Sequence, residues 1–201
     1  MLKSSIESEN ARRAVGRRTF LLASGVALAG LAVWRYQSME PAHAEPAPAA
    51  MPKQVTLVDF TDDGGRKGTI SVPTIQKTDA EWKKQLSPDS YEVARHAGTE
   101  RPFTGELLNV HDKGVFRCIC CDNALFSSTT KFESGTGWPS FWAPIAKENI
   151  LESVDISLGM QRTAVSCRRC DAHLGHVFDD GPRPTGLRYC MNSVAMRFAK
   201  G

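Results

Sequence analysis

Short stretches in the C-terminal half of the chain either alternate between apolar and polar residues or are rich in β-branched residues. Such patterns are typical of β-strands, whose successive side chains point to opposite faces of a sheet. Turn-forming sequences such as Asp180-Gly181-Pro182 separate the stretches. We therefore expect strands over residues 115–118, 153–158, 163–167 and 188–198.

Two short helices are predicted ahead of these strands. Thr78-Asp79-Ala80-Glu81 has the capping-box pattern, in which the first and last side chains bond to each other's backbone N–H groups. Ser87-Pro88 starts a second helix, because proline is favoured in the first turn, and Gly98 ends it. The pattern as a whole predicts a mainly β domain with short N-terminal helices packed on antiparallel sheets.

The first 44 residues have the pattern of an export signal. Arg17-Arg18 precede an apolar run over residues 20–34, and Ala42-His43-Ala44 is a small-x-small cleavage pattern. A run of 15 residues is short for a permanent membrane span, which needs about 20. The paired arginines resemble a twin-arginine (Tat) signal. We expect export, to the periplasm, with an uncleaved anchor facing the periplasm or an ordinary helix as the alternatives.

A linker is expected between this signal and the folded domain. Residues 45–54 are rich in proline and alanine, a composition typical of a flexible spacer. We place the linker and the lead-in to the domain over residues 45–74, with folding starting between 55 and 75. The domain proper is predicted over residues 75–201.

The net charge of +3 comes from the leader. Residues 1–44 hold six basic and three acidic side chains, so the remaining chain holds 19 of each (25 − 6 and 22 − 3). A domain without net charge lacks the basic surface that nucleic-acid binding requires, and we expect no nucleic-acid partner. Nothing in the pattern requires more than a monomer.

The spacing of the cysteines predicts a metal centre. Cys118 and Cys121 form one Cys-x-x-Cys pair, and Cys167 and Cys170 form another 45 residues later. Such pairs direct two sulfurs into one tetrahedral zinc site, so we expect a structural zinc, held by all four cysteines, that joins two hairpins. The alternatives are disulfides between the same thiols, a redox-active pair, or free buried thiols.

A second group of residues suggests nucleophilic chemistry. Cys190 follows Arg188 at a spacing of two, which places both on one face of a strand, and a nearby cation lowers a thiol pKa. His173 and His176 are three residues apart and can supply a proton. Trp138 follows two glycines, and its ring can form one side of a pocket for a small apolar group. Each of these residues alone is more often structural than functional.

These motifs together resemble the methionine-R-sulfoxide reductases of the B class (MsrB). The matching segments span roughly residues 78–198 and include 101–105, 134–142, 167–178 and 188–192. The resemblance implies a fold of two antiparallel sheets, sometimes called a β-tent. It also implies that Cys190 attacks the sulfoxide sulfur of an oxidised methionine in a protein or peptide and becomes a sulfenic acid. The implied supporting residues are Arg188, His173, His176 and Asn192 around the sulfur, with Trp138 against the substrate methyl group.

One position departs from part of that family. Thr136 stands where some members carry a resolving cysteine, so that route to an intramolecular disulfide is absent. We expect an external, thioredoxin-like thiol donor, with Cys120 as a minor alternative for resolution. Two other interpretations stay open at this point: a secreted zinc-bound β domain that binds a partner without catalysis, and a thiol-exchange protein.

Overall fold

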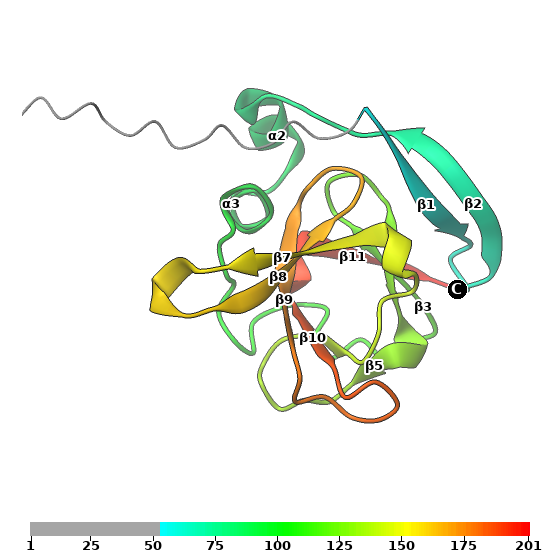
Figure 1. Cartoon of the computed structure of the whole chain (residues 1–201), viewed down its shortest axis with the longest axis vertical. Coiled ribbons are helices and arrows are strands. Elements are labelled where there is room, and N and C mark those ends of the chain that lie inside the picture. The colour runs from blue at the N-terminus through cyan, green and yellow to red at the C-terminus, as the bar shows by residue number, and fades with distance from the viewer. Residues whose placement is uncertain (1–52) are drawn as a thin grey trace, which may run out of the picture. The chain divides into compact units, whose positions relative to one another are not determined.

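The computed structural model of the protein describes residues 53–201 (Figure 1). The predicted export signal and residues 45–52 of the predicted linker lie outside this range. Within residues 53–201, neither helix has the length and hydropathy that a membrane span requires. The helices are α2 (Asp79–Gln85) and α3 (Pro88–His96), and the 3-10 turns are η1 (Ser128–Thr130), η2 (Lys147–Asn149), η3 (Ser157–Gly159) and η4 (Ser193–Ala195).

Eleven strands of the described chain form three sheets, and every strand pair is antiparallel. One sheet has six strands in the order β5-β6-β10-β9-β8-β7, one has three in the order β11-β3-β4, and β1-β2 form a hairpin. The predicted mainly β fold with antiparallel sheets and short helices is confirmed. The strands are β1 (Gln54–Phe60), β2 (Arg66–Pro73), β3 (Gly114–Cys118), β4 (Ala124–Ser127), β5 (Lys131–Phe132), β6 (Ser140–Phe141), β7 (Ile150–Asp155), β8 (Arg162–Cys167), β9 (His173–Phe178), β10 (Arg188–Met191) and β11 (Met196–Lys200).

Both helices begin as predicted. Thr78 and Glu81 form the capping box of α2, and Ser87 caps α3 with Pro88 in its first turn. Helix α3 ends at His96, two residues before Gly98, because the next residue, Ala97, adopts the left-handed conformation with a φ of 52°. The local hydrogen bonds of the caps explain why these elements could be predicted from sequence.

Aromatic side chains fill the core around β3, β4 and β6. The Phe126 and Phe141 rings stack with centroids 4.5 Å apart, and Phe116 meets Phe141 edge-on at 4.9 Å. All three side chains are fully buried. The core therefore joins β3 and β4 of the three-stranded sheet to β6 of the six-stranded sheet.

The predicted single strand over 188–198 is wrong. Strand β10 ends at Met191, and the chain passes through η4 before β11 begins in the other sheet. The break occurs because the backbone N–H groups of Ser193 and Val194 donate to the Glu100 carboxylate, at 2.7 and 3.0 Å, instead of to a neighbouring strand. The predicted strand over 153–158 is likewise shifted, since β7 ends at Asp155 and η3 follows.

The first described strand begins at Gln54, next to the early end of the range 55–75 in which folding was expected to start. Strands β1 and β2 occupy residues 54–73 inside the predicted linker and lead-in, and they run side by side at the upper right of Figure 1. The fully buried Asn149 ties this hairpin to the rest. Its amide accepts from the Val58 N–H at 2.8 Å and donates to the carbonyls of Val58 and Ala124, both at 2.8 Å. Such a link between distant segments leaves no local pattern in the sequence.

Candidate active site and metal centre

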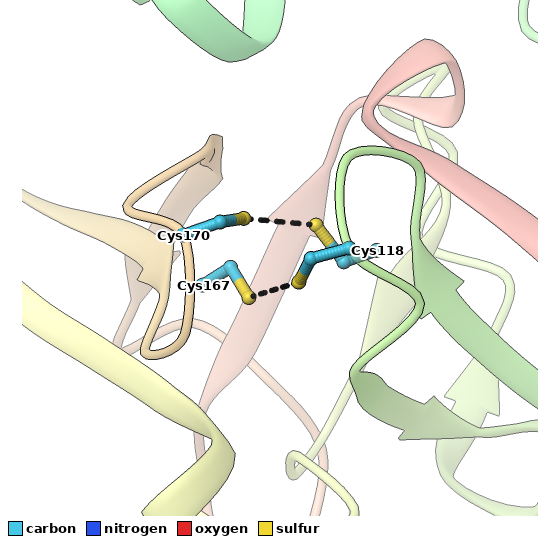
Figure 2. Close-up of side chains that lie close together, drawn as sticks. Cys118, Cys167 and Cys170 are labelled. Carbon is cyan, nitrogen blue, oxygen red and sulfur yellow. Dashed lines mark hydrogen bonds between the residues drawn. The ribbon is translucent and has the colours of Figure 1, made fainter. Parts of the chain in front are cut away.

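Four cysteine sulfurs converge from two hairpin turns. Cys118 ends β3 and Cys121 lies in the turn that leads to β4, while Cys167 ends β8 and Cys170 lies in the turn that leads to β9. All four sulfurs lie within 4.8 Å of one another. Figure 2 shows the Cys118 and Cys170 side chains pointing toward each other, with Sγ atoms 3.6 Å apart.

The two turns have the same local structure. After each Cys-x-x-Cys pair an aspartate adopts the left-handed conformation, Asp122 with a φ of 63° and Asp171 with a φ of 58°. In each turn the aspartate N–H donates to the carbonyl of the first cysteine at 2.9 Å. Aspartate tolerates this conformation better than most residues. The repeated Cys-x-x-Cys-Asp sequence therefore produces two matching turns that present their sulfurs alike.

The geometry of the cluster fits a tetrahedral metal site. A Zn–S distance of about 2.3 Å gives an edge of about 3.8 Å between sulfurs in a tetrahedron. The Cys118–Cys170 and Cys121–Cys167 sulfurs are 3.6 and 3.5 Å apart, well beyond the S–S bond of about 2.05 Å in a disulfide. Asn123 Nδ2 supports the set by donating to the Cys167 sulfur at 3.5 Å. These four cysteines could hold a metal ion, and the ion would join the three-stranded sheet to the six-stranded sheet.

Cys190 lies in β10 at the centre of the six-stranded sheet and is partly exposed. It pairs with His176 of β9 on one side and Ser140 of β6 on the other, and residues that pair directly share a face of the sheet. The Thr136 hydroxyl lies 3.9 Å from the Cys190 sulfur. Burial raises the pKa of the Cys190 thiol above its ordinary value, and Thr136 and Arg188 oppose that rise only in part. Arg188 thus lowers the pKa of this thiol as expected, but desolvation outweighs its effect.

Arg188 lies two residues before Cys190, on the same face of β10, as predicted. Its guanidinium forms a bidentate pair with Asp180, with both N–O distances at 2.8 Å, and lies 4.4 Å from the centre of the Phe178 ring. This hydrogen-bonded pair lowers the pKa of Asp180 and raises that of Arg188. Asp180 was recognised from sequence only as a turn residue; its role in holding Arg188 depends on the fold.

His176 is held by a carboxylate that the sequence did not reveal. Its Nε2 lies 2.7 Å from Asp155 Oδ2, and the Arg162 guanidinium bonds to the same oxygen at 2.8 Å. Hydrogen bonds from the Ser157 side chain and backbone, followed by the bond to His176, lower the pKa of Asp155. The carboxylate thus fixes the orientation of the imidazole that stands opposite Cys190.

His173 lies beside His176 because β9 contains a bulge. Residues three apart in a regular strand face opposite sides, but the pairing with β8 shifts between Val165 and Ser166. The two histidine rings meet edge-on with centroids 5.3 Å apart. His173 is buried and its Nε2 has no hydrogen-bond partner among the described residues. Burial, followed by the neighbouring His176, lowers the pKa of His173 to about 4.

Trp138 and Asn192 meet through Glu100, a residue that the sequence analysis missed. The Trp138 indole N–H donates to the Glu100 carbonyl at 3.1 Å, and the Glu100 N–H donates to Asn192 Oδ1 at 3.0 Å. Asn192 Nδ2 in turn donates to the Leu174 carbonyl at 3.0 Å. Glu100 also holds η4 through its carboxylate, so one residue fixes both the tryptophan and the turn after Cys190.

A groove of about 720 Å³ opens beside the histidines. Its walls include both imidazoles and the Asp155–Arg162 pair, together with the exposed side chains of Val154 and Ile156. Apolar walls with a few convergent polar groups are typical of ligand sites. Of the sequence-predicted site residues, this groove is lined by His173 and His176, whereas Cys190 lies outside its lining.

The described chain thus combines a four-cysteine cluster that could hold a metal ion with a separate, partly exposed cysteine that pairs with a histidine of the neighbouring strand. A family model described as the SelR domain matches residues 86–200, more than half of the chain. The chain belongs to the SelR domain family.

Curated relatives agree with this membership. The chain is 56% identical over 124 residues to the peptide methionine sulfoxide reductase MsrB of Hahella chejuensis (strain KCTC 2396), covering 62% of this chain and 89% of that protein. It is 59% identical over 122 residues to the protein of the same name from Pseudomonas syringae pv. syringae (strain B728a), covering 61% and 93%. It is 56% identical over 124 residues to the chloroplastic peptide methionine sulfoxide reductase B1 of Oryza sativa subsp. japonica, covering 61% and 58%.

Replacement of one cluster cysteine tests the metal centre. We expect Cys118→Ser to lose the bound metal and to lower the thermal midpoint by about 10 °C or more, because metal binding contributes directly to folding. Elemental analysis and thermal unfolding measure the two effects. Cys120→Ser is the matched control, since Cys120 lies in the same turn but outside the four-sulfur set. Equal midpoints for Cys118→Ser and the unmodified protein would contradict a structural metal.

Burial of His173 predicts a pH-dependent stability. The folded pKa of about 4 lies below the ordinary 6.5, so the unfolded state binds more protons in this window and stability falls as the pH drops from 6.5 to 4. The difference between the two pKa values corresponds to about 3 kcal/mol. Urea unfolding between pH 4 and 7 should show a smaller decline for His173→Gln than for the parent. His111→Gln, at an exposed site, is the control, and parallel curves for all three proteins would refute this role for His173.

Proposed function

We propose that this chain reduces methionine-R-sulfoxide in proteins or peptides to methionine, with Cys190 as the nucleophile. The observation that carries the proposal is the pairing of Cys190 with His176 across β9 and β10, in a chain of the SelR domain family. Arg188, held by Asp180 on the same face, supplies a fixed positive charge beside the sulfur. This combination activates a thiol and supplies a proton near it.

The proposed reaction balances around one oxygen atom. The Cys190 thiolate attacks the sulfoxide sulfur, the S–O bond breaks, and the oxygen is transferred to Cys190 with a proton. The substrate sulfur is reduced by two electrons to the thioether, and Cys190 is oxidised by two electrons to a sulfenic acid. Because burial raises the pKa of Cys190, Arg188 and the Thr136 hydroxyl are needed to stabilise the attacking thiolate.

His176 is the proton donor that we favour. It pairs directly with Cys190 across β9 and β10, and its ring is oriented by Asp155, which is an oppositely charged partner when the ring is protonated. His173 has a pKa of about 4 and is therefore neutral at neutral pH, so it cannot act as an imidazolium there. We assign His173 to the wall of the groove, where it limits the space around His176.

Trp138 and Asn192 complete the proposed substrate site. The Trp138 ring is half-buried and its N–H is engaged by Glu100, so its apolar surface is held in place to contact the substrate methyl group. The buried Asn192 side chain links the backbone of Glu100 to that of Leu174 in β9. It positions the turn that follows the nucleophile.

Regeneration of Cys190 is proposed to use an external thiol donor, such as a thioredoxin-like protein. Two donor thiols reduce the sulfenic acid to the thiol, release water and become a disulfide. Thr136 lies beside the Cys190 sulfur where a resolving cysteine would be needed. Cys120 is buried at 5% exposure in the turn of the metal cluster, which disfavours it as the attacking thiol.

We further propose that zinc is the metal of the cluster and that it has no catalytic step. Four thiolates form a closed tetrahedral set, which is the ligand set of structural zinc and leaves no open position for substrate. The ion would supply folding free energy and hold the turns that precede β4 and β9.

Stereospecific turnover tests the proposed activity. The purified protein with its metal is incubated with a mixture of R and S methionine sulfoxide in a blocked amino acid and a small dithiol, and each epimer is followed by chiral separation. We expect loss of the R form alone, retained in Cys120→Ser and reduced at least about 1,000-fold in Cys190→Ser, because no other group replaces the nucleophile. Cys190→Ser should keep its metal and thermal midpoint.

Persistence of both epimers with an intact fold and bound metal would contradict the activity. It would instead favour a binding domain without catalysis, whose partner binding Cys190→Ser would leave unchanged.

Export by the twin-arginine route remains our proposal for localisation. Such a route carries folded proteins, so the metal could bind in the reducing cytoplasm before the cysteines meet an oxidising compartment. A reporter fused behind residues 1–50 should lose export when Arg17 and Arg18 both become lysine. Unchanged export of that double variant, measured by cell fractionation, would point to another route.

A further inference from the structure

Phe103 is an exposed aromatic residue with an unfavourable backbone conformation. Its side chain is 68% exposed, and its φ of 64° lies in the left-handed region. This region is disfavoured for bulky L residues, and outliers of this kind concentrate at functional sites. Since the exposed ring contributes little to the core, packing does not explain why a phenylalanine occupies this position.

The residue is fixed to the loop that carries Trp138. The Phe103 N–H donates to the Gly137 carbonyl at 2.8 Å. A Cβ on Gly137 would lie 2.9 Å from the Phe103 ring and 2.8 Å from Pro102 Cβ, so glycine is required for this close approach. The Thr104 hydroxyl closes the same segment by donating to the Arg101 carbonyl at 2.8 Å.

Gly137 connects Phe103 to both sides of the proposed site. Trp138, the proposed wall for the substrate methyl group, is the next residue in the chain. Thr136, on the other side, lies 3.9 Å from the Cys190 sulfur. The ring of Phe103 therefore stands at the edge of the site, against the backbone between the tryptophan and the nucleophile's neighbour.

We propose that the Phe103 ring binds the apolar side chain of a residue next to the oxidised methionine in a peptide substrate. The inference rests on the proposed function and adds a specificity determinant to it. A blocked single amino acid has no such neighbour, whereas a peptide segment that carries the sulfoxide to Cys190 must pass over the edge of the site. Contact with an apolar neighbour would remove the ring and that side chain from water, which favours binding.

Three substrates and two variants test the proposal in the full chain with its metal. The substrates are N-acetyl-methionine-R-sulfoxide, a peptide with leucine on both sides of methionine-R-sulfoxide, and the same peptide with serine on both sides. We expect Phe103→Ala to lower the ratio of kcat/KM for the leucine peptide to kcat/KM for the blocked amino acid by about five- to ten-fold, mainly through KM. The serine peptide should show less than about a two-fold change.

Phe103→Gly separates binding from packing. Glycine adopts a positive φ without strain, so the thermal midpoint should stay equal or rise while the preference for the leucine peptide falls as in Phe103→Ala. Ile70→Ala is the matched control, because Ile70 is also an exposed apolar side chain, at 40%, but lies on the β1–β2 hairpin. It should leave the substrate ratio unchanged.

Unchanged ratios in both Phe103 variants would overturn the proposal. So would an equal loss on all three substrates with a lower thermal midpoint, which would assign the ring to packing of the Trp138 loop. Failure of the proposed function is distinguishable, because the unmodified protein would then reduce none of the substrates. In that case, the leucine and serine peptides can be titrated into Cys190→Ser, with and without Phe103→Ala. The change in Kd caused by Phe103→Ala then still measures the contact between the Phe103 ring and the neighbouring leucine.

Discussion

Four cysteine sulfurs from two hairpin turns meet at one point, and a metal ion bound there would hold the three-stranded sheet against the six-stranded sheet. The two Cys-x-x-Cys-Asp turns reach it through the same left-handed aspartate and the same backbone hydrogen bond. Strand β9, which starts just after Cys170 and Asp171, carries both site histidines. A metal ion held there would be separate from the proposed chemistry, yet it would fix the strand on which that chemistry depends.

The partial burial of Cys190 has two opposing effects on its thiol. Partial burial shields the thiol but raises its pKa, so the thiolate needs compensating partners. Arg188 and His176 are both held by carboxylates, Asp180 and Asp155. Each carboxylate restrains a side chain that the proposed mechanism places at the sulfur. The site is therefore built as a thiol with two oriented neighbours, which is the arrangement that preorganised catalysis requires.

Thr136 and Phe103 make the loop before Trp138 the most distinctive part of the site. Thr136 supplies a hydroxyl, not a second thiol, beside Cys190, so the proposed mechanism requires a thiol donor from outside to reach the oxidised Cys190. Phe103 is fixed to the adjoining Gly137 by a backbone hydrogen bond. In the proposed function, the peptide substrate would pass over this exposed edge on its way to Cys190.

Features that depend on residues a few positions apart could be predicted from the sequence. They are the helix caps at Thr78 and Ser87, the paired cysteines, and the placement of Cys190 beside Arg188. The break after β10 and the roles of Asp155 and Glu100 were not predictable. The Glu100 carboxylate accepts hydrogen bonds from two N–H groups of η4 that lie 93 and 94 residues later in the sequence. Asn149 accepts a hydrogen bond from Val58, which lies 91 residues earlier. Backbone and side-chain groups accept any partner of suitable geometry, so sequence spacing decides the local pairs, and only the folded chain decides which distant groups meet.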